Sequence, residues 1–217
     1  MIGLDLFSDQ IEPRLKFAEG AYYLSGFALP VADQLYELLI AHFKIHPLQT
    51  MKTPMGHKMS VRTTSFGQFG WMGTKGGYGY AKTNPETKQP WPPIPLPFLM
   101  LARTAAKQAG YHHFEPDTCL VNVYEVGSKM GLHQDKDEYD FSQPIVSVSL
   151  GLSATFQFGG LTRQDKVQKI LANHGDIIVW GARSRMCFHG VLPIKEGVHP
   201  LFGKKRINLT FRKAGKM

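Results

Sequence analysis

Two side chains that commonly bind metals stand two positions apart in the segment 130–138, MGLHQDKDE. His133 and Asp135 would project to the same side of an extended chain, because side chains on a strand alternate between its faces. A third ligand would come from a distant strand, and His189 in MCFHGV has strand-like surroundings, whereas His174 in NHGD looks like a turn residue. Two histidines and one carboxylate form the facial triad of non-haem Fe(II) oxygenases, which leaves positions open for a cosubstrate and O₂.

Each of these residues also has a purely structural interpretation. His-x-Asp alone can be a polar loop, and a histidine among apolar strand residues, as His189 is, is usually a satisfied core residue. Zinc hydrolases combine two histidines with a carboxylate from a helical His-Glu-x-x-His pattern, which this chain lacks. The order of His133 and Asp135, then a strand histidine 54 residues after Asp135, then Arg212, favours the iron site.

The segment 206–212, RINLTFR, alternates polar and apolar side chains. If its apolar face contacts the core, the polar row is an ordinary solvent-exposed surface. The alternative is a polar cavity inside a barrel, where inward arginines need an anion because an unpaired buried charge is costly. Asn122 and Tyr124 likewise share one face of LVNVYE, and walls of Asn, Tyr and Arg suit a small dicarboxylate. The polar row consists of Arg206, Asn208, Thr210 and Arg212.

The hydrophobic pattern changes along the chain. Apolar residues at helical spacing predict helices over 30–43 and 98–110, and the glycines and prolines between them predict a loop-rich region. After residue 116 the segments TCLVNVYE, PIVSVSLG, ATFQFGG, DIIVW, RMCFHGV and RINLTFR read as short strands separated by turns. Many short strands indicate a sandwich, barrel or jelly roll rather than alternating βα units, with the helices in the N-terminal half.

Composition limits the class of protein. The 217 residues fit a single domain, 1–217, and an apolar content of 43% with 19% charged residues is ordinary for a folded protein. No apolar run is long enough to span a membrane, and no signal peptide is visible at the start. Cys119 and Cys187 form neither a metal-type pair nor a disulfide framework, which suggests a reducing compartment, the cytoplasm if the source is bacterial.

Positive charge gathers in one region. The net charge is +8, and from Lys44 to Lys88 seven basic residues accompany one acid, Glu86, a local charge of +6. A solvated basic surface is one interpretation. The same stretch contains five aromatic residues, however, and positive charge interleaved with aromatics suits phosphate contact and base stacking, so 44–90 is a candidate set of nucleotide-recognition loops. The aromatics are Phe66, Phe69, Trp71, Tyr78 and Tyr80.

At this point the sequence resembles a known family. LHQDKDE, IVSVSLGL, FQFGG, HGDIIVW, FHGV and RINLTFR, in this order, are similar to motifs of the AlkB-type DNA alkylation-repair dioxygenases, and LDLF near the start agrees. The resemblance covers nearly the whole chain. It implies a double-stranded β-helix, or jelly-roll, core with N-terminal helices packed outside. It assigns Fe(II) to His133, Asp135 and His189, and 2-oxoglutarate to Asn122, Tyr124, Arg206, Asn208 and Arg212.

The resemblance also implies an activity. The family oxidatively demethylates 1-methyladenine and 3-methylcytosine in single-stranded or flipped-out DNA, consuming O₂ and 2-oxoglutarate and releasing succinate and formaldehyde. By position Trp71 would stack on the base opposite His133, and Asp137 would lie near its exocyclic amine. Phosphate, backbone or further base contacts would fall to Tyr78, Thr53 and Arg163.

Some features depart from the family pattern or leave alternatives open. Ile207 follows Arg206, and the segment 55–64 carries extra positive charge, which puts base preference in doubt and makes RNA or tRNA a plausible substrate. A second alternative is an oxygenase acting on protein or a small metabolite, and a third is a non-catalytic nucleic-acid-binding jelly roll. No membrane and no obligate protein partner are expected.

Overall fold

The computed structural model describes residues 14–52, 56–74 and 77–215. Its strands form two main antiparallel sheets and one hairpin. The larger sheet contains, in spatial order, β1 (Arg14–Ala18), β2 (Ala21–Leu24), β12 (Ile177–Trp180), β9 (Ile145–Gly151), β14 (Lys205–Arg212), β7 (Thr118–Glu125), β4 (Lys58–Gly67) and β3 (Gln49–Lys52). The smaller sheet contains β11 (Gln168–Ala172), β10 (Ala154–Phe158), β13 (His189–Val191) and β8 (Met130–His133). The hairpin pairs β5 (Gly70–Thr74) with β6 (Gly77–Ala81).

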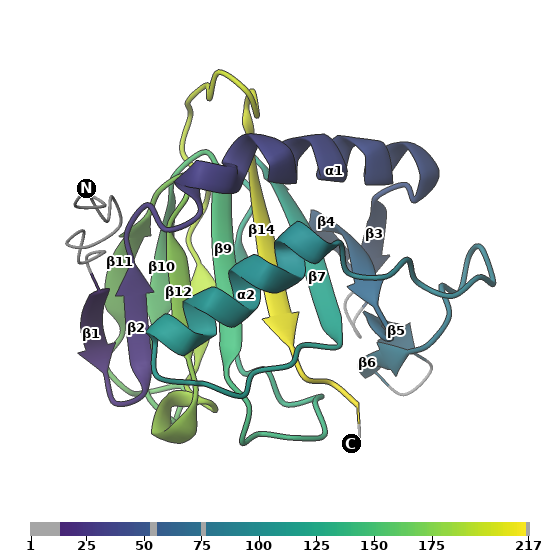
Figure 1. The fold of residues 1–217 in the computed structure, drawn as a ribbon. Coiled ribbons are helices and arrows are strands. Elements are labelled where there is room, and N and C mark those ends of the chain that lie inside the picture. The colour runs from purple at the N-terminus through teal and green to yellow at the C-terminus, as the bar shows by residue number, and fades with distance from the viewer. Residues whose placement is uncertain (1–13, 53–55, 75–76, 216–217) are drawn as a thin grey trace, which may run out of the picture.

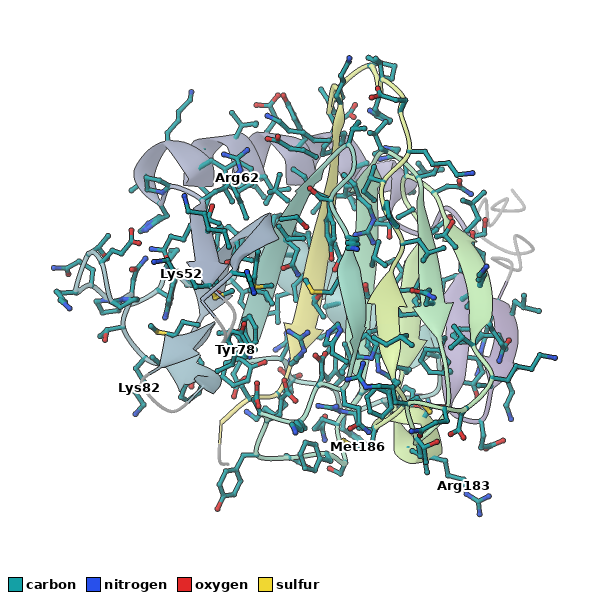
Figure 2. The ribbon with its side chains drawn as sticks, turned by 180° about the vertical axis from the view of Figure 1, so that it is seen from behind. Lys52, Arg62, Tyr78, Lys82, Arg183 and Met186 are labelled. Atoms are coloured by element: carbon teal, nitrogen blue, oxygen red, sulfur yellow. The ribbon has the colours of Figure 1, made fainter. Side chains whose placement is uncertain are left out.

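Two helices cover the outer face of the larger sheet (Figure 1). They are α1 (Ala32–Ile45) and α2 (Leu96–Gln108), close to the predicted ranges, and short 3₁₀ turns occur at Leu29–Val31 and Ala182–Ser184. The smaller sheet lies on the opposite side, toward the viewer in Figure 2. This arrangement confirms the predicted double-stranded β-helix with helices packed outside. Within the described ranges, neither helix is long and apolar enough to cross a membrane.

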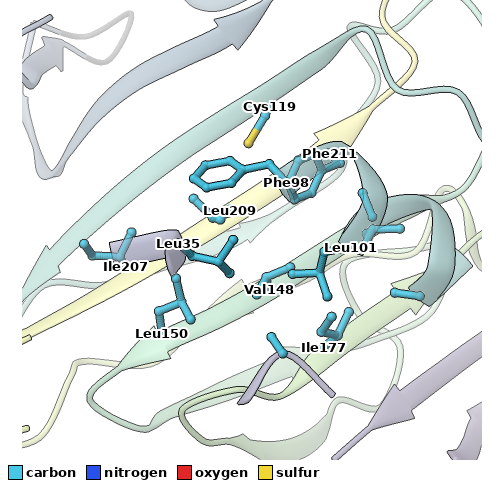
Figure 3. Packing of buried hydrophobic residues seen from close by; sticks show 14 of the residues in the cluster. Leu35, Phe98, Leu101, Cys119, Val148, Leu150, Ile177, Ile207, Leu209 and Phe211 are labelled. Carbon is cyan, nitrogen blue, oxygen red and sulfur yellow. The ribbon is translucent and has the colours of Figure 1, made fainter. Parts of the chain in front are cut away.

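The main hydrophobic core lies between the helices and the larger sheet (Figure 3). Leu35 of α1 and Phe98 of α2 are fully buried there, with the apolar side chains of β14 beneath them. Those side chains are Ile207, Leu209 and Phe211. A second buried cluster, which includes Trp180 and Phe158, fills the space between the two sheets. The two clusters therefore cover both faces of the central strands.

Strand β14 consequently has no solvent-exposed face. Its residues from Arg206 to Arg212 are all buried, although polar and apolar side chains alternate along it. A solvent-exposed polar row is therefore wrong, and the inward-facing polar cavity is the arrangement that the chain adopts. The reason is tertiary: the helices cover one face of the strand, and the second sheet closes over the other.

Two expectations about secondary structure are wrong. The region between the helices contains four strands, β3 to β6, rather than mainly loops, and β4 joins the larger sheet by pairing with β7. The glycine-rich β5 and β6 are strands because they pair with each other along their whole length. The predicted strand RMCFHGV is shorter than expected and includes only His189–Val191, since residues 185–188 follow a 3₁₀ turn.

A buried histidine in α1 makes stability depend on pH. His42 is 6% exposed, its Nε2 atom lies 3.0 Å from the Thr64 hydroxyl oxygen, and its ring contacts Phe66 and His46. Burial, and next the nearby His46, lowers the pKa of His42 to about 4. The unfolded chain takes up this proton at about pH 6.5 and the folded chain does not. The stability that the neutral, buried His42 provides is therefore fully present above about pH 6.5. It is lost as the pH falls toward 4, because protons then bind to the unfolded chain in preference to the folded one.

Urea unfolding of the wild type and of His42→Gln across this pH window tests the effect. Between about pH 7.5 and pH 4.5 the unfolding free energy of the wild type should fall by on the order of 1 to 2 kcal/mol more than that of the variant, after allowance for solvent screening. His112→Gln, at an exposed position, is the matched control and should follow the wild type. Equal slopes in the wild type and His42→Gln would contradict the prediction.

Candidate active site

The three predicted metal ligands meet at one point. The ligand atoms of His133, Asp135 and His189 all lie within 4.8 Å of one another. Each histidine Nε2 atom is 3.7 Å from an Asp135 carboxylate oxygen, and the two imidazole rings are 4.4 Å apart. Among the described residues, these three form the group of histidine, cysteine or carboxylate side chains that could hold a metal ion.

The smaller sheet places the two histidines. Strands β8 and β13 pair so that His133 lies directly opposite His189, and Asp135 follows two residues after the end of β8. Gly190 allows this close approach, because a Cβ atom there would lie 2.8 Å from the carbonyl oxygen of Met130. His133 and Asp135, which are near each other in the sequence, thus form one cluster with His189, which lies 54 residues after Asp135, as the spacing predicted.

Both imidazole rings are oriented by backbone hydrogen bonds. The Nδ1 atom of His133 donates to the Gly131 carbonyl at 2.9 Å, and that of His189 donates to the Cys187 carbonyl at 3.0 Å. A proton on Nδ1 leaves the Nε2 lone pair directed toward Asp135, as a metal ligand requires. Burial, and next His133, lowers the pKa of His189 to about 3, so this ring is neutral near pH 7.

Arg212 holds the carboxylate of the cluster. Its Nε and Nη2 atoms donate to Asp135 Oδ2 at 2.7 and 2.6 Å. Burial alone would raise the pKa of Asp135, but the charge of Arg212, followed by the two histidines, outweighs it and keeps that pKa well below its ordinary value. Asp135 is therefore a carboxylate with one oxygen oriented by a fixed cation, in the ionisation state that binds a metal.

A cavity of about 460 Å³ opens beside this cluster, which is within the range of small-molecule sites. Arg206 lines this cavity and is 1% exposed, and its Nε and Nη1 atoms have no hydrogen-bond partner in the described chain. The buried Arg212 Nη1 and Asn122 Oδ1 atoms also have none there. Buried, unpaired guanidinium donors require an anion, so this donor set fits the carboxylates of 2-oxoglutarate.

Neighbouring side chains hold the cosubstrate wall in place. The Asn208 amide donates to Ser147 Oγ at 2.8 Å and to the Val148 carbonyl at 2.9 Å, and its oxygen accepts from Thr210 at 2.8 Å. Arg206 Nη2 donates to Ser149 Oγ at 3.1 Å. Sequence reasoning missed the two serines, although the alternation in IVSVSLG places both on one face of β9.

The mouth of the cavity contains the predicted substrate residues. Trp71 of β5 and Tyr78 of β6 stack on each other with ring centroids 4.6 Å apart, and Trp71 Nε1 donates to Asp137 Oδ2 at 2.8 Å. Arg163 Nη1 donates to the Leu132 carbonyl at 2.8 Å. All four side chains line the cavity that also contains the iron-site residues. Thr53 lies outside the described residues.

Three further residues behind the metal cluster were not predicted. The buried Glu138 and Arg185 and the half-buried Tyr80 form a hydrogen-bonded group that contacts Asp135 and Arg212. No local signal marks Glu138, which stands in the acid-rich DKDEYD and resembles a solvated acid. Its burial depends on partners 47 and 58 residues away.

An antiparallel double-stranded β-helix with a His-Asp-His cluster at the edge of its cavity defines the class of non-haem iron oxygenases. In agreement, the model of the 2OG-Fe(II) oxygenase superfamily matches residues 20–212. The Alpha-ketoglutarate-dependent dioxygenase AlkB of Salmonella typhimurium (strain LT2) is 49% identical over 97% of this chain and 98% of its own length. The solved structure of OsALKBH1 superposes with a TM-score of 0.79 and 29% identity, covering 93% of this chain and all of that one.

A more distant relative is the DNA N(6)-methyladenine demethylase ALKBH1C of Arabidopsis thaliana, 33% identical over 61% of this chain and 35% of its own length. The match to the Salmonella typhimurium enzyme decides the family, because it is 49% identical and covers nearly the whole of both chains. The chain belongs to the AlkB-type dioxygenases of the 2OG-Fe(II) oxygenase superfamily. It is an Fe(II)- and 2-oxoglutarate-dependent enzyme that uses O₂.

Proposed function

We propose that this enzyme oxidatively demethylates N-alkylated bases, such as 1-methyladenine and 3-methylcytosine, in single-stranded or flipped-out DNA. One observation carries the proposal: the His-Asp-His cluster and the unpaired Arg206 donors share a cavity with the stacked Trp71–Tyr78 pair. Metal, dicarboxylate and planar base can thus be held within one enclosure. The name of the Arabidopsis relative, a DNA demethylase, supports the same substrate class.

In this proposal His133, Asp135 and His189 bind Fe(II), and Arg206 and Arg212 bind the two carboxylates of 2-oxoglutarate. Bound together, the metal and cosubstrate supply the oxidation of the N-methyl carbon by O₂, with succinate and CO₂ as products and formaldehyde released from the base. Asn122, Tyr124 and Asn208 complete the cosubstrate wall. The protein orients the reactants and excludes water, and the low exposure of Asp135 and His189 serves that purpose.

The base-binding part of the proposal rests on the cavity mouth. We assign Trp71 as the stacking surface for the flipped base, with His133 on its other side, because both line the cavity and His133 is the more exposed of the two histidine ligands. Asp137 accepts from Trp71 through Oδ2, and we assign its second oxygen to the exocyclic amine. A carboxylate there favours the cationic bases 1-methyladenine and 3-methylcytosine over unmethylated ones.

The nucleic-acid backbone would cross the basic surface beside the hairpin. Lys52 and Lys82 are exposed there, on the same side of the molecule as Tyr78 in Figure 2. The Tyr78 hydroxyl donates to the Lys52 carbonyl at 3.2 Å, so the aromatic mouth directly contacts the end of β3 that carries this lysine. We propose phosphate contacts from these residues and from Arg163 and Thr53, with binding that weakens steeply as salt rises.

Formaldehyde release from methylated oligonucleotides tests the function. With Fe(II), 2-oxoglutarate and O₂, single-stranded DNA containing 1-methyladenine should yield about one formaldehyde per succinate, and the unmethylated oligonucleotide none. The same lesion in RNA and in double-stranded DNA, run in parallel, defines the preferred substrate. Succinate formation without formaldehyde from any methylated nucleic acid would instead indicate an oxygenase acting on protein or a small metabolite.

A further inference from the structure

A buried carboxylate lies between two arginines directly behind the metal cluster. Glu138 is 6% exposed, and its Oε2 atom accepts from Arg185 Nη2 at 2.9 Å. Its Oε1 atom accepts from the Tyr80 hydroxyl at 2.6 Å and lies 3.4 Å from Arg212 Nε. Glu138 does not line the cavity, so it cannot touch metal, cosubstrate or base directly. Its effects on them must pass through its neighbours.

The two arginines hold Asp135 at different atoms. Arg212 binds the carboxylate, whereas Arg185 Nη1 donates to the Asp135 backbone carbonyl at 2.8 Å. Arg185 Nε also donates to the Gln143 carbonyl at 3.1 Å, so one guanidinium fastens the segment 135–143 at both ends. Cations and carboxylates thus alternate in one buried chain, Arg185–Glu138–Arg212–Asp135. Glu138 is the counter-ion that lets two buried arginines sit beside one metal ligand.

The third partner of Glu138 comes from the base-binding hairpin. Tyr80 lies on β6, opposite Trp71 on β5, and its hydroxyl is the group that reaches Glu138. The hairpin therefore contacts the segment after the metal ligand at two points, Tyr80 to Glu138 and Trp71 to Asp137. The first contact is partly buried and leads to Arg212, while the second is exposed and leads to the substrate mouth.

We infer that Glu138 is a positioning residue that couples the seating of the β5–β6 hairpin to the binding of metal and 2-oxoglutarate. Glu138 fixes Arg212, and through it Asp135, only while the Tyr80 hydroxyl donates to the same Oε1 atom that faces Arg212. Because coupling between binding and conformation is reciprocal, ligands that order Arg212 and Asp135 also tighten the hairpin. The inference rests on the proposed function only in calling the hairpin the base-binding element.

The test uses the full chain without nucleic acid, with Mn(II) in place of Fe(II) so that no turnover occurs. Isothermal titration measures the Kd of 2-oxoglutarate in the presence of Mn(II), and hydrogen–deuterium exchange measures protection of the β5 and β6 amides. In the wild type, 2-oxoglutarate should slow exchange in both strands. Glu138→Gln should weaken 2-oxoglutarate binding about tenfold, as substitutions behind metal ligands commonly do, and abolish the added protection.

Tyr80→Phe removes only the hydroxyl that donates to Glu138. It therefore tests the coupling between the hairpin and 2-oxoglutarate binding while leaving the Glu138 carboxylate in place. It should weaken 2-oxoglutarate binding severalfold in the wild-type background and add no further loss in Glu138→Gln, because both act through one contact. Glu125→Gln, an exposed carboxylate paired with Arg62 at 2.8 Å, is the matched control and should behave as wild type.

A purely structural role for Glu138 predicts a different pattern. Either of two results overturns the inference. One is a Glu138→Gln variant that melts at a lower temperature but binds 2-oxoglutarate with the wild-type Kd. The other is a double variant in which the losses of 2-oxoglutarate affinity caused by the two substitutions add. If Glu138→Gln does not fold, Tyr80→Phe decides alone: wild-type affinity and wild-type protection of β5 and β6 in that variant also overturn it. Neither measurement involves nucleic acid, so failure of the demethylation proposal gives a separate result.

Discussion

An Asp135→Ala variant should lose turnover and bind Mn(II) or Fe(II) at least a hundredfold more weakly than the wild type, on the order of 3 kcal/mol. Asp135 is the one carboxylate among the three clustered ligands, and both histidine Nε2 atoms face it at 3.7 Å. In its absence only two neutral histidine nitrogens would bind the metal, and no ligand would neutralise the positive charge of the metal ion. Isothermal titration with Mn(II) and a succinate assay measure the two losses.

The substitution also breaks a buried ion pair, which has to be separated from the loss of a ligand. Arg212 would lose the acceptor of both its Nε and Nη2 atoms, and removing one partner of a buried pair costs about 3 to 5 kcal/mol. Asp135→Asn retains an oxygen for Arg212 but not the charge, so it should be more stable than Asp135→Ala while still binding metal poorly. Metal affinity near the wild-type value in folded Asp135→Asn would contradict a ligand role.

A control in the same segment removes a carboxylate without touching the cluster. Asp140 accepts from the Ser142 backbone N–H at 2.9 Å and is five residues from Asp135. Asp140→Asn should therefore retain wild-type metal affinity and turnover. A comparable loss in this variant would indicate that net charge near the cavity, rather than ligation by Asp135, controls metal binding.

The metal and cosubstrate sites were predictable because they depend on period-two alternation and on short spacing. His133 and Asp135 lie two residues apart, and Arg206, Asn208 and Arg212 follow one face of one strand. The sequence of that strand did not determine whether this face was inside or outside, because the alternation is the same in both cases. The answer depends on α1 and α2, which cover the face with Leu209 and leave the polar face to the second sheet.

The hairpin and the buried group behind the metal were not predictable, for a different physical reason. Glycine-rich β5 and β6 have low strand propensity, and they are held by pairing with each other and by Trp91, on which Gly70 packs so closely that a Cβ atom would clash. Glu138 is buried only because Tyr80 and Arg185 reach it from distant parts of the chain. Local sequence patterns contain no record of such long-range contacts.

Replacement of Arg206 should weaken the binding of 2-oxoglutarate without lowering metal affinity or the stability of the ligand-free protein. Arg206 is 1% exposed, its guanidinium lies 4.9 Å above the Tyr124 ring, and Nη2 donates to Ser149 Oγ, while Nε and Nη1 lack a partner in the described chain. Burial lowers its pKa from the ordinary value. In the absence of cosubstrate this cation is therefore poorly compensated, and the carboxylate of 2-oxoglutarate is the group that satisfies it.

Arg206→Met should consequently weaken 2-oxoglutarate binding by a hundredfold or more, within the range of about 2 to 5 kcal/mol for a buried charged hydrogen-bonding partner. Mn(II) affinity should change less than twofold. The melting temperature of the ligand-free variant should equal or exceed that of the wild type, because methionine removes a buried unpaired charge, whereas added 2-oxoglutarate should stabilise only the wild type. Arg62→Met, whose guanidinium pairs with Glu125 on the surface, is the matched control and should keep the cosubstrate response. A ligand-free Arg206→Met protein that is strongly destabilised, yet still binds 2-oxoglutarate tightly, would show that this arginine supports the sheet rather than the cosubstrate.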